Sequence, residues 1–165
     1  MKANELNLKR FLGQPETQFV IPVYQRNYDW TNVQCKQLID DIINVSRNDK
    51  INAHFIGSIV YIHDGVYTSS GIRELTVIDG QQRLTTITLL YIAIYRLFKE
   101  MNREIDAERV LETFLTNKYA PKEKMKLLLT ENNHKALLSL YQENEDDYPE
   151  YSRIIENFRY INTRL

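Results

Sequence analysis

The chain has 165 residues, 43% of them hydrophobic and 26% charged, which is typical of one globular domain or of a domain with a small appendage. Its formal net charge of −1 argues against a protein held to nucleic acid or to an anionic membrane by bulk charge. The single cysteine, Cys35, excludes an internal disulfide and fits a reducing compartment, and no apolar stretch is long enough to span a bilayer. We therefore expect a cytoplasmic protein.

The first third of the chain predicts short elements of alternating type. Apolar residues before Gly13 predict a helix over residues 5–12, and the β-rich segment 18–21 predicts a strand that stops at Pro22. After an aromatic loop, Thr31 and Gln34 have the spacing of a capping box, and apolar residues at helical intervals continue to about residue 46. A helix is expected there.

The middle of the chain predicts a β-hairpin that leads into a long helix. His54–His63 and Ile72–Ile78 are expected to be its two strands, with Asp64-Gly65 at the turn. At Asp79-Gly80 the apolar period changes from 2 to 3.6 and predicts a helix over residues 81–102. Because this helix is apolar over most of its circumference, we expect it to be buried at the centre of the fold.

The last third is predicted to be mainly helical. Asp106 and Thr130 are each placed to cap a helix, and Met125–Leu129 fits either a strand or an extended linker. The last helix carries an apolar stripe that still runs at Leu165 without a cap. Either its partner surface lies in residues outside this chain, or the helix docks on its own domain.

The sharpest functional motif is a strand that turns on a glycine into the long helix. The first helical turn carries unpaired N–H groups and the positive end of the helix dipole, Gly80 allows close approach of a ligand, and Arg83 can bind phosphate oxygens in a bidentate manner. Asp79 can hold a divalent cation or position a water. The alternative is an ordinary helix start, with Asp79 as the N-cap and Gln81 and Gln82 facing solvent. The candidate residues are Asp79, Gly80, Gln81, Gln82, Arg83, Thr85 and Thr86.

A second candidate site lies in the loop between the first strand and the second helix. Tyr24, Tyr28 and Trp30 could stack on a base there, and Arg26 could supply a second positive charge. The alternative is that the aromatic side chains close one end of the core while Arg26 pairs with Asp29. The loop taken alone favours this structural interpretation.

A third candidate site begins the first hairpin strand. Gly57 inside a strand marks a place where a ligand or another backbone approaches closely, and His54 could donate a hydrogen bond or act as an acid or base. His63 and His134 have no partners at metal-ligand spacing, so the pattern predicts no zinc site. Cys35 lies within a helix and is expected to pack in the core.

In this order, the segments PVYQRNYDW (22–30), HFIGSIV (54–60) and VIDGQQRLTT (77–86) strongly resemble the N-terminal domain of GmrSD-type, modification-dependent restriction endonucleases, also called domain of unknown function 262. LLLTENNHKALLSL (127–140) is similar to the continuation of that family. The resemblance implies an α+β fold of the ParB/sulfiredoxin-like kind, a small mixed sheet packed with helices and followed by a helical C-terminal segment. We expect a nucleotide-binding domain over residues 1–103 and a truncated helical extension over residues 104–165.

The resemblance also implies roles for these motifs. Residues 79–83 match the D-G-Q-Q-R signature that the family uses for nucleoside triphosphate binding and hydrolysis, and residues 24–26 match its Y-Q-R signature on the same pocket. Asp79, Gln82 and Arg83 are the expected catalytic residues of a Mg²⁺-dependent NTPase, with Asp79 as the metal ligand. The expected nucleotide-binding residues are Tyr24, Gln25, Arg26, Tyr28, Trp30, His54, Gly57, Gly80, Gln81, Thr85 and Thr86.

Full-length members of the family carry an HNH-type nuclease domain, and no histidine follows His134 here. We therefore expect no DNA cleavage by this polypeptide alone, and we expect either a truncated protein or one subunit of a split system, whose oligomeric state stays open. The leading hypothesis is a nucleotide-binding, NTP-hydrolysing regulatory domain of an anti-phage restriction protein. The alternative is a module that senses modified DNA without turnover, through a basic patch at Arg26, Arg73 and Arg83.

Overall fold

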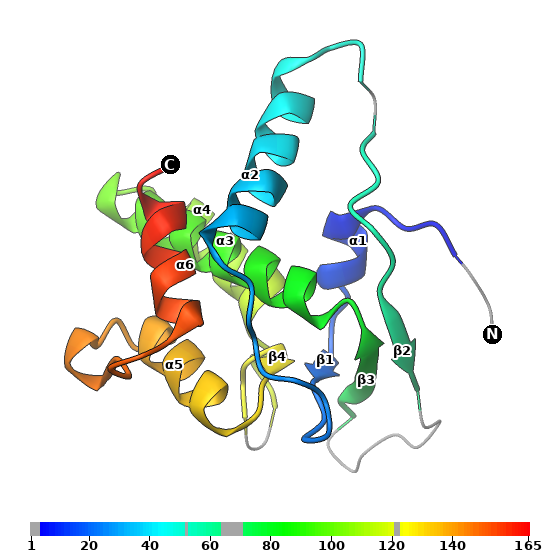
Figure 1. Cartoon of the computed structure of the whole chain (residues 1–165), viewed down its shortest axis with the longest axis vertical. Helices are drawn as coiled ribbons and strands as arrows, with labels where there is room; N and C mark the ends of the chain where they lie inside the picture. The colour runs from blue at the N-terminus through cyan, green and yellow to red at the C-terminus, as the bar shows by residue number, and fades with distance from the viewer. Residues whose placement is uncertain (1–3, 52, 64–70, 121–122) are drawn as a thin grey trace.

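The computed structural model describes residues 4–51, 53–63, 71–120 and 123–165. Over these residues a four-stranded mixed sheet packs with six α-helices (Figure 1), which confirms the predicted α+β class. The α-helices are α1 (Leu8–Leu12), α2 (Asn32–Arg47), α3 (Gln81–Glu100), α4 (Glu104–Val110), α5 (Glu131–Tyr141) and α6 (Arg153–Asn162). A π-helical turn, Leu111–Leu115, follows α4. Within the described residues no helix combines the length and the hydropathy needed to cross a bilayer.

The sheet brings the aromatic loop after the first strand and the glycine turn before the long helix to the same edge. Its strands are β1 (Thr17–Val20), β2 (Val60–Ile62), β3 (Arg73–Asp79) and β4 (Leu127–Leu128), in the order β2-β3-β1-β4. β1 runs parallel to β3 and to β4, while β2 is antiparallel to β3. Because β1 and β3 are parallel neighbours, their carboxyl ends meet at the same edge. The loop after β1 therefore lies beside the glycine turn after β3.

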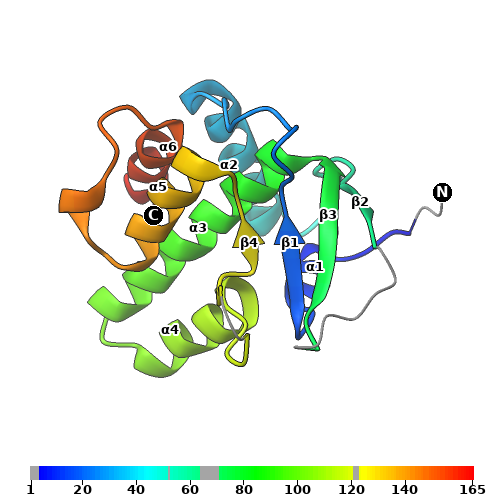
Figure 2. The ribbon, with the colours of Figure 1, turned by 90° about the horizontal axis from the view of Figure 1, so that it is seen from below.

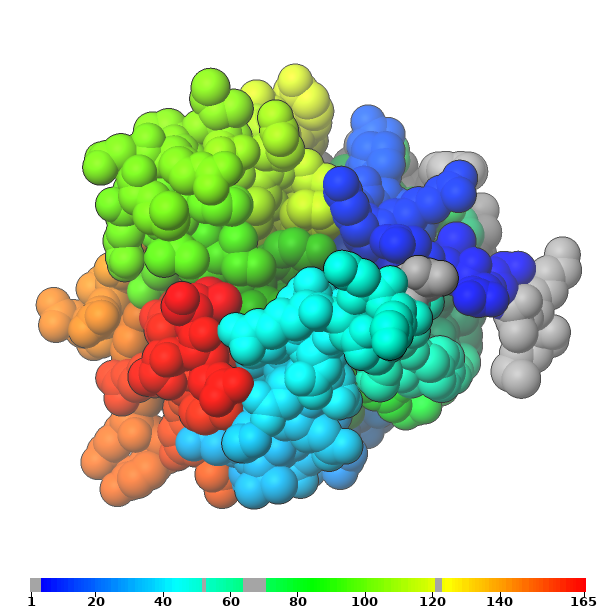
Figure 3. All heavy atoms as spheres, turned by 90° about the horizontal axis from the view of Figure 1, so that it is seen from above, coloured from blue at the N-terminus to red at the C-terminus, as the bar shows by residue number. Residues whose placement is uncertain are grey.

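The long helix α3 is the centre of the fold, as its sequence predicts. It leads away from the end of β3 and lies between α4 and α6 (Figure 2). On the face seen in Figure 3, α2 and α6 lie side by side, and Arg164 donates from Nη2 to Asp40 Oδ1 at 2.6 Å. Ten side chains of α3 are buried, which include the two glutamines of its first turn. This helix therefore connects the sheet edge to the helical tail.

One sequence expectation about the middle of the chain is wrong in detail. The first hairpin strand is confined to Val60–Ile62, and residues 54–59 form no strand. Gly57 adopts φ +106°, which takes the backbone out of the β region, and the β2–β3 register shifts between Val60 and Tyr61. The expected turn at Asp64-Gly65 lies outside the described residues.

The tail also departs from some expectations. α4 begins at Glu104, so Asp106 lies in its first turn instead of capping it, and it accepts a hydrogen bond from Arg103 Nε at 2.8 Å. β4 settles the strand-or-linker ambiguity in favour of a strand that pairs with β1. α6 ends at Asn162 with Thr163 as its C-cap, so the helix does not continue to Leu165. Its apolar stripe is buried against the chain itself, at Ile154, Ile155, Phe158 and Ile161.

One hydrophobic cluster contains core residues from both sides of residue 103. Phe19 and Leu84 belong to it together with Leu127 and Phe158. The tail also contributes β4 to the sheet and α6 to the surface of α3. The division into a domain at 1–103 and an extension at 104–165 stays a prediction about folding units.

A buried lysine joins the tail to the first helix. Lys126, which is 3% exposed, donates from Nζ to the carbonyl oxygens of Leu12, Gln14 and Thr113 at 3.0, 2.7 and 2.7 Å. Burial lowers the pKa of Lys126 from 10.5 to about 8. The ammonium group thus satisfies three carbonyl groups that would otherwise be left with fewer partners in the interior.

We expect Lys126→Met to lower the free energy of unfolding by about 2 kcal/mol or more, because three carbonyl groups lose a charged donor. The matched variant is Lys124→Met, since Lys124 is exposed and two residues away. The measurement is urea unfolding monitored by circular dichroism. Equal stability of the two variants would contradict this role of Lys126.

The same lysine gives a sign for the pH dependence. Between its folded pKa of about 8 and its unfolded value of 10.5, the unfolded chain binds a proton that the folded chain has lost. Stability contributed by Lys126 therefore rises with pH across this window. Repeating the unfolding at about pH 7 and about pH 9.5 should show a wider gap between wild type and Lys126→Met at the higher pH.

Candidate functional site

The loop after β1 is fastened to the start of α3 by the side chain of Gln82. Its Nε2 donates to the carbonyl of Asn27 at 3.0 Å, and its Oε1 accepts from the backbone N–H groups of Asp29 at 3.0 Å and Trp30 at 3.4 Å. Gln82 is only 6% exposed. The amide group therefore holds the loop by three backbone groups at once.

Gln81 holds the preceding part of the same loop. Its Nε2 donates to the carbonyl of Arg26 at 3.0 Å and approaches Gln25 Oε1 at 3.5 Å, while Gln25 donates to the carbonyl of Ile78 in β3 at 3.0 Å. Both glutamines of α3 are buried, so the alternative with solvent-facing glutamines is wrong. Its N-cap assignment is also wrong, because Gly80 is the N-cap residue.

A third attachment of the loop is the buried hydroxyl of Tyr28. It lies 2.8 Å from Thr86 Oγ1 and accepts a hydrogen bond from Asn157 Nδ2 at 2.8 Å. Burial raises the pKa of Tyr28 well above its usual 10.0, so the hydroxyl keeps its proton at neutral pH. Thr86 Oγ1 in turn lies 2.9 Å from the carbonyl of Gln82. Base stacking by Tyr28 stays untested, and in this structure its side chain anchors the loop.

These attachments leave an open hollow of about 130 Å³ between the loop and the first turn of α3. Arg26 comes from the loop and Arg83 from the helix, so the first and third motifs of the resemblance converge here. Arg26 is paired with Asp29 at 3.1 Å, as the structural alternative expects, although its side chain is 67% exposed. The predicted residues that line the hollow are Gln25, Arg26, Trp30, Asp79, Gly80, Gln81, Gln82 and Arg83.

The segment 57–59 supports the guanidinium group of Arg83. Arg83 donates from Nη1 to the carbonyl of Ser58 at 2.9 Å. A Cβ atom at Gly57 would lie 1.9 Å from Arg83 Nη1, and a Cβ atom at Gly80, which has φ +89°, would lie 2.8 Å from the carbonyl oxygen of Ser58. Both glycines therefore allow a close backbone approach. Gly57 contributes to the site because its missing Cβ leaves room for the guanidinium group of Arg83.

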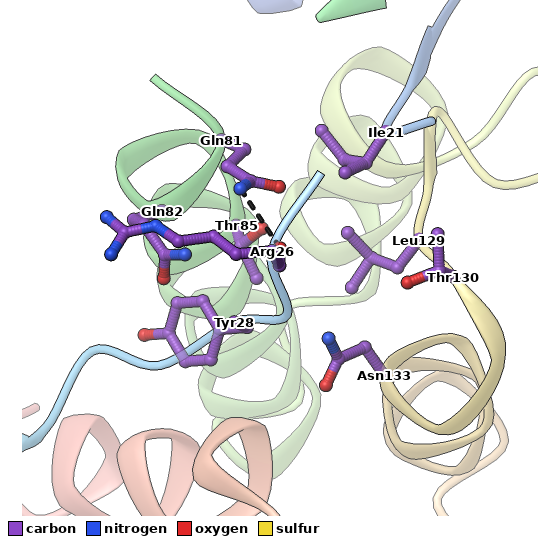
Figure 4. Close-up of a pocket in the computed structure, with 9 residues that line it drawn as sticks. All are labelled: Ile21, Arg26, Tyr28, Gln81, Gln82, Thr85, Leu129, Thr130 and Asn133. Atoms are coloured by element: carbon purple, nitrogen blue, oxygen red, sulfur yellow. Dashed lines mark hydrogen bonds between the residues drawn. The ribbon is translucent and has the colours of Figure 1, made fainter. Parts of the chain in front are cut away.

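A second, much smaller hollow of about 10 Å³, close to the space that one water molecule needs, is shown in Figure 4. Arg26, Gln81 and Gln82 line both hollows. Thr85, which is 2% exposed, reaches this hollow, and its other wall comes from the tail. The remaining lining residues are Ile21, Tyr28, Leu129, Thr130 and Asn133.

Four of the predicted nucleotide-binding residues line neither hollow: Tyr24, His54, Gly57 and Thr86. His54 Nε2 lies 3.5 Å from Asp41 Oδ2 on α2, and Tyr24 is 72% exposed in the loop after β1. The hydroxyl of Thr86 is engaged with Tyr28 and with the carbonyl of Gln82. The structure therefore brings most of the predicted residues to the two hollows but leaves these four outside both.

The predicted metal ligand, Asp79, is exposed at the wall of the larger hollow. Across the described part of the chain, no three His, Cys, Asp or Glu side chains gather closely enough to hold a metal ion. Mg²⁺ is often bound by one or two carboxylates together with substrate phosphates and water, so one carboxylate at this position fits such a site. The role of Asp79 stays a prediction.

Sequence reasoning missed three polar residues of the tail that contribute to the site. Thr130 and Asn133 line the smaller hollow, and Asn157 contacts the loop from α6. Asn157 left a signal, because it is a polar residue inside the apolar stripe of an amphipathic helix. A buried polar residue in such a stripe needs a hydrogen-bond partner elsewhere in the fold.

Comparison with known proteins agrees with this arrangement of motifs. The family described as the N-terminal domain of the GmrSD restriction endonuclease matches the chain over residues 8–165. The matched range covers the loop after β1, the glycine turn before α3 and the helical tail. No curated protein matches the chain significantly.

We expect Gln82→Leu to lower the free energy of unfolding by about 2 kcal/mol, since three backbone groups of the loop lose their partner. The matched variant is Gln142→Leu, because Gln142 is exposed beyond the end of α5. Urea unfolding and hydrogen exchange of the loop amides are the measurements. Unchanged exchange at Asp29 and Trp30 would contradict the assignment.

Gly57→Ala should displace the guanidinium group of Arg83, because the new Cβ would occupy its position. Gly71→Ala is the matched control: Gly71 also has positive φ, at +73°, but open space surrounds its Cβ position. Both variants carry a backbone penalty of about 1 kcal/mol, whereas only Gly57→Ala should shift the Arg83 Nε–Hε resonance in NMR spectra. Equal spectra would rule out this support of Arg83.

Proposed function

The chain belongs to the family of GmrSD restriction endonuclease N-terminal domains, and from that premise we propose that it is the nucleotide-binding module of a restriction protein. In this proposal the larger hollow, between the loop and the first turn of α3, binds the triphosphate of a nucleoside triphosphate. The family implies a restriction-protein module. DNA and an HNH-type nuclease are the expected partners in the full-length protein, which we expect to act in the cytoplasm.

The convergence of Arg26, Arg83 and the start of α3 on one hollow carries this proposal. Guanidinium groups bind phosphate oxygens in a bidentate manner, and the first turn of a helix presents free N–H groups and a positive dipole end. Gly80 caps α3 without a side chain, so nothing of its own covers those N–H groups.

Phosphate binding and phosphate hydrolysis use different residues of those that line the larger hollow. Arg83 and the helix start stabilise the negative charge that develops on the transferred phosphoryl group. Asp79 is placed to orient the attacking water or to hold Mg²⁺, which supplies further positive charge when bound. Both amide atoms of Gln82 hold the loop, so we give Gln82 a positioning task.

The aromatic residues of the loop have different positions relative to a bound nucleotide. Trp30 lines the larger hollow and is partly exposed, so its indole ring is the residue we assign to stacking on a base. Tyr28 is buried with its hydroxyl engaged. Tyr24, being mostly exposed, is available only to a ligand that extends beyond the hollow.

The arrangement of arginines does not favour the alternative of DNA sensing without turnover. Arg73 is the first residue of β3, whereas the hollow lies after its last residue, Asp79. The six-residue offset along the strand separates these positions by about 20 Å. At the start of β3, the side chain of Arg73 donates to Gln14. The expected patch of Arg26, Arg73 and Arg83 is therefore not formed.

The test is a thermal-shift and calorimetric titration of the chain with ATP, GTP, CTP and UTP, with and without Mg²⁺. A ligand at about 100 times its Kd adds about 2.7 kcal/mol of stability. We expect Arg83→Gln to weaken binding by about tenfold or more, because a charged hydrogen-bonding group is lost. Arg83→Lys, which keeps the charge but not the bidentate geometry, should bind with intermediate affinity.

The control for these variants is Arg109→Gln, since Arg109 is 71% exposed on α4 and does not line the hollow. It should bind like wild type. Absence of a shift with every nucleotide at millimolar concentration would contradict the proposal. Salt-dependent binding of DNA without nucleotide would then favour the alternative.

A further inference from the structure

The side chain of Asn157 lies between α6 and the loop that forms the wall of the larger hollow. It is fully buried, and its Nδ2 donates to the carbonyl of Trp30 and to Tyr28 Oη, both at 2.8 Å. The carbonyl of Trp30 can only accept, so it fixes which end of the amide faces the loop. Asn157 Oδ1 is then buried without a hydrogen-bond partner among the described residues.

The contact continues as a directed chain of hydrogen bonds into α3. Because Tyr28 Oη accepts from Asn157, its own proton is available for Thr86 Oγ1, 2.8 Å away. The Thr86 hydroxyl donates to the carbonyl of Gln82 at 2.9 Å. Asn157, Tyr28, Thr86 and Gln82 are all buried. We call these four residues the α6–α3 relay.

The relay holds Trp30 by both of its backbone polar groups. Its N–H faces Gln82 Oε1 at 3.4 Å, and its carbonyl accepts from Asn157 at 2.8 Å. One partner belongs to α3 and the other to α6, so a shift of either helix moves Trp30. Trp30 lines the larger hollow, which makes the shape of that hollow depend on the docking of α6.

Asn157 is a polar residue in the otherwise apolar stripe of α6, and both of its donor contacts go to the loop, at Tyr28 and Trp30. Buried polar groups of this kind specify one arrangement over its competitors. The arrangement specified here is that of the loop.

We propose that Asn157 is a positioning residue of the pocket, so that docking of α6 and occupation of the larger hollow are thermodynamically coupled. The identity of the occupant rests on the proposed function, whereas the coupling of α6 to the loop does not. Coupling of this kind is reciprocal: a ligand that orders the loop also strengthens the docking of α6.

The protein carries its own reporter for this test, because Trp30 is the only tryptophan in the sequence. The variant is Asn157→Leu, which removes both hydrogen bonds to the loop. Its control is Ile154→Val, on the same helix and also fully buried, which loosens the packing of α6 without removing a hydrogen bond. We expect Asn157→Leu, but not the control, to shift the Trp30 emission and to speed hydrogen exchange at residues 28–31.

Nucleotide affinity and pH give readouts that a merely structural role would not move. Asn157→Leu should weaken nucleotide binding by about fivefold or more, a usual size for coupling between sites, while Ile154→Val leaves it near wild type. In Asn157→Asp, a protonated carboxyl can still donate one hydrogen bond, whereas a carboxylate can donate none to the carbonyl of Trp30. Binding and emission of this variant should therefore approach those of wild type as the pH falls.

Each outcome decides one claim. If wild type binds no nucleotide, the proposed function fails, and the Trp30 emission and hydrogen exchange still test the coupling. Identical emission and exchange in Asn157→Leu and Ile154→Val would overturn the coupling whatever the ligand is. A change in emission with unchanged nucleotide affinity would overturn the positioning role.

Discussion

The amide side chains of Gln81 and Gln82 hold the loop after β1 against the start of α3, and the shape of the candidate site depends on them. Parallel pairing of β1 and β3 brings the loop and the helix start to the same edge of the sheet, but it leaves the path of the loop undetermined. The two amides fix that path at Arg26, Asn27 and Asp29. Since Gln81 and Gln82 are buried, an amide that loses its partner on the loop bears the cost of an unmade hydrogen bond.

This use of the glutamines determines which groups are left for a ligand. The loop engages both amide atoms of Gln82 and Nε2 of Gln81. The charged and dipolar groups that remain for a ligand are the two guanidinium groups of Arg26 and Arg83, the carboxylate of Asp79 and the N–H groups of the first turn of α3. Three of these four sources are positive, which suits an anionic ligand. The carboxylate is the one group that would need a cation or a water between itself and a phosphate.

Local patterns in the sequence were sufficient for the long elements and insufficient for the site. The capping box at Thr31 and Gln34 and the buried helix α3 were predicted because their signals lie within a few residues. The burial of Gln82 follows from contacts with residues more than 50 positions earlier, which no local pattern contains. The local sequence predicts that Gly57 lies in a strand. Its φ of +106° and the position of the Arg83 guanidinium group next to it appear only in the structure.

Two polar side chains buried in the tail, Lys126 and Asn157, make contacts of different kinds. Lys126 has three donors and three carbonyl acceptors around it, so its burial is matched group by group and its effect is to hold elements together. Asn157 has both donor contacts on the loop and an acceptor oxygen with no partner among the described residues. The contacts of Asn157 hold the backbone of Trp30 in one position. Trp30 in turn lines the larger hollow of the candidate site.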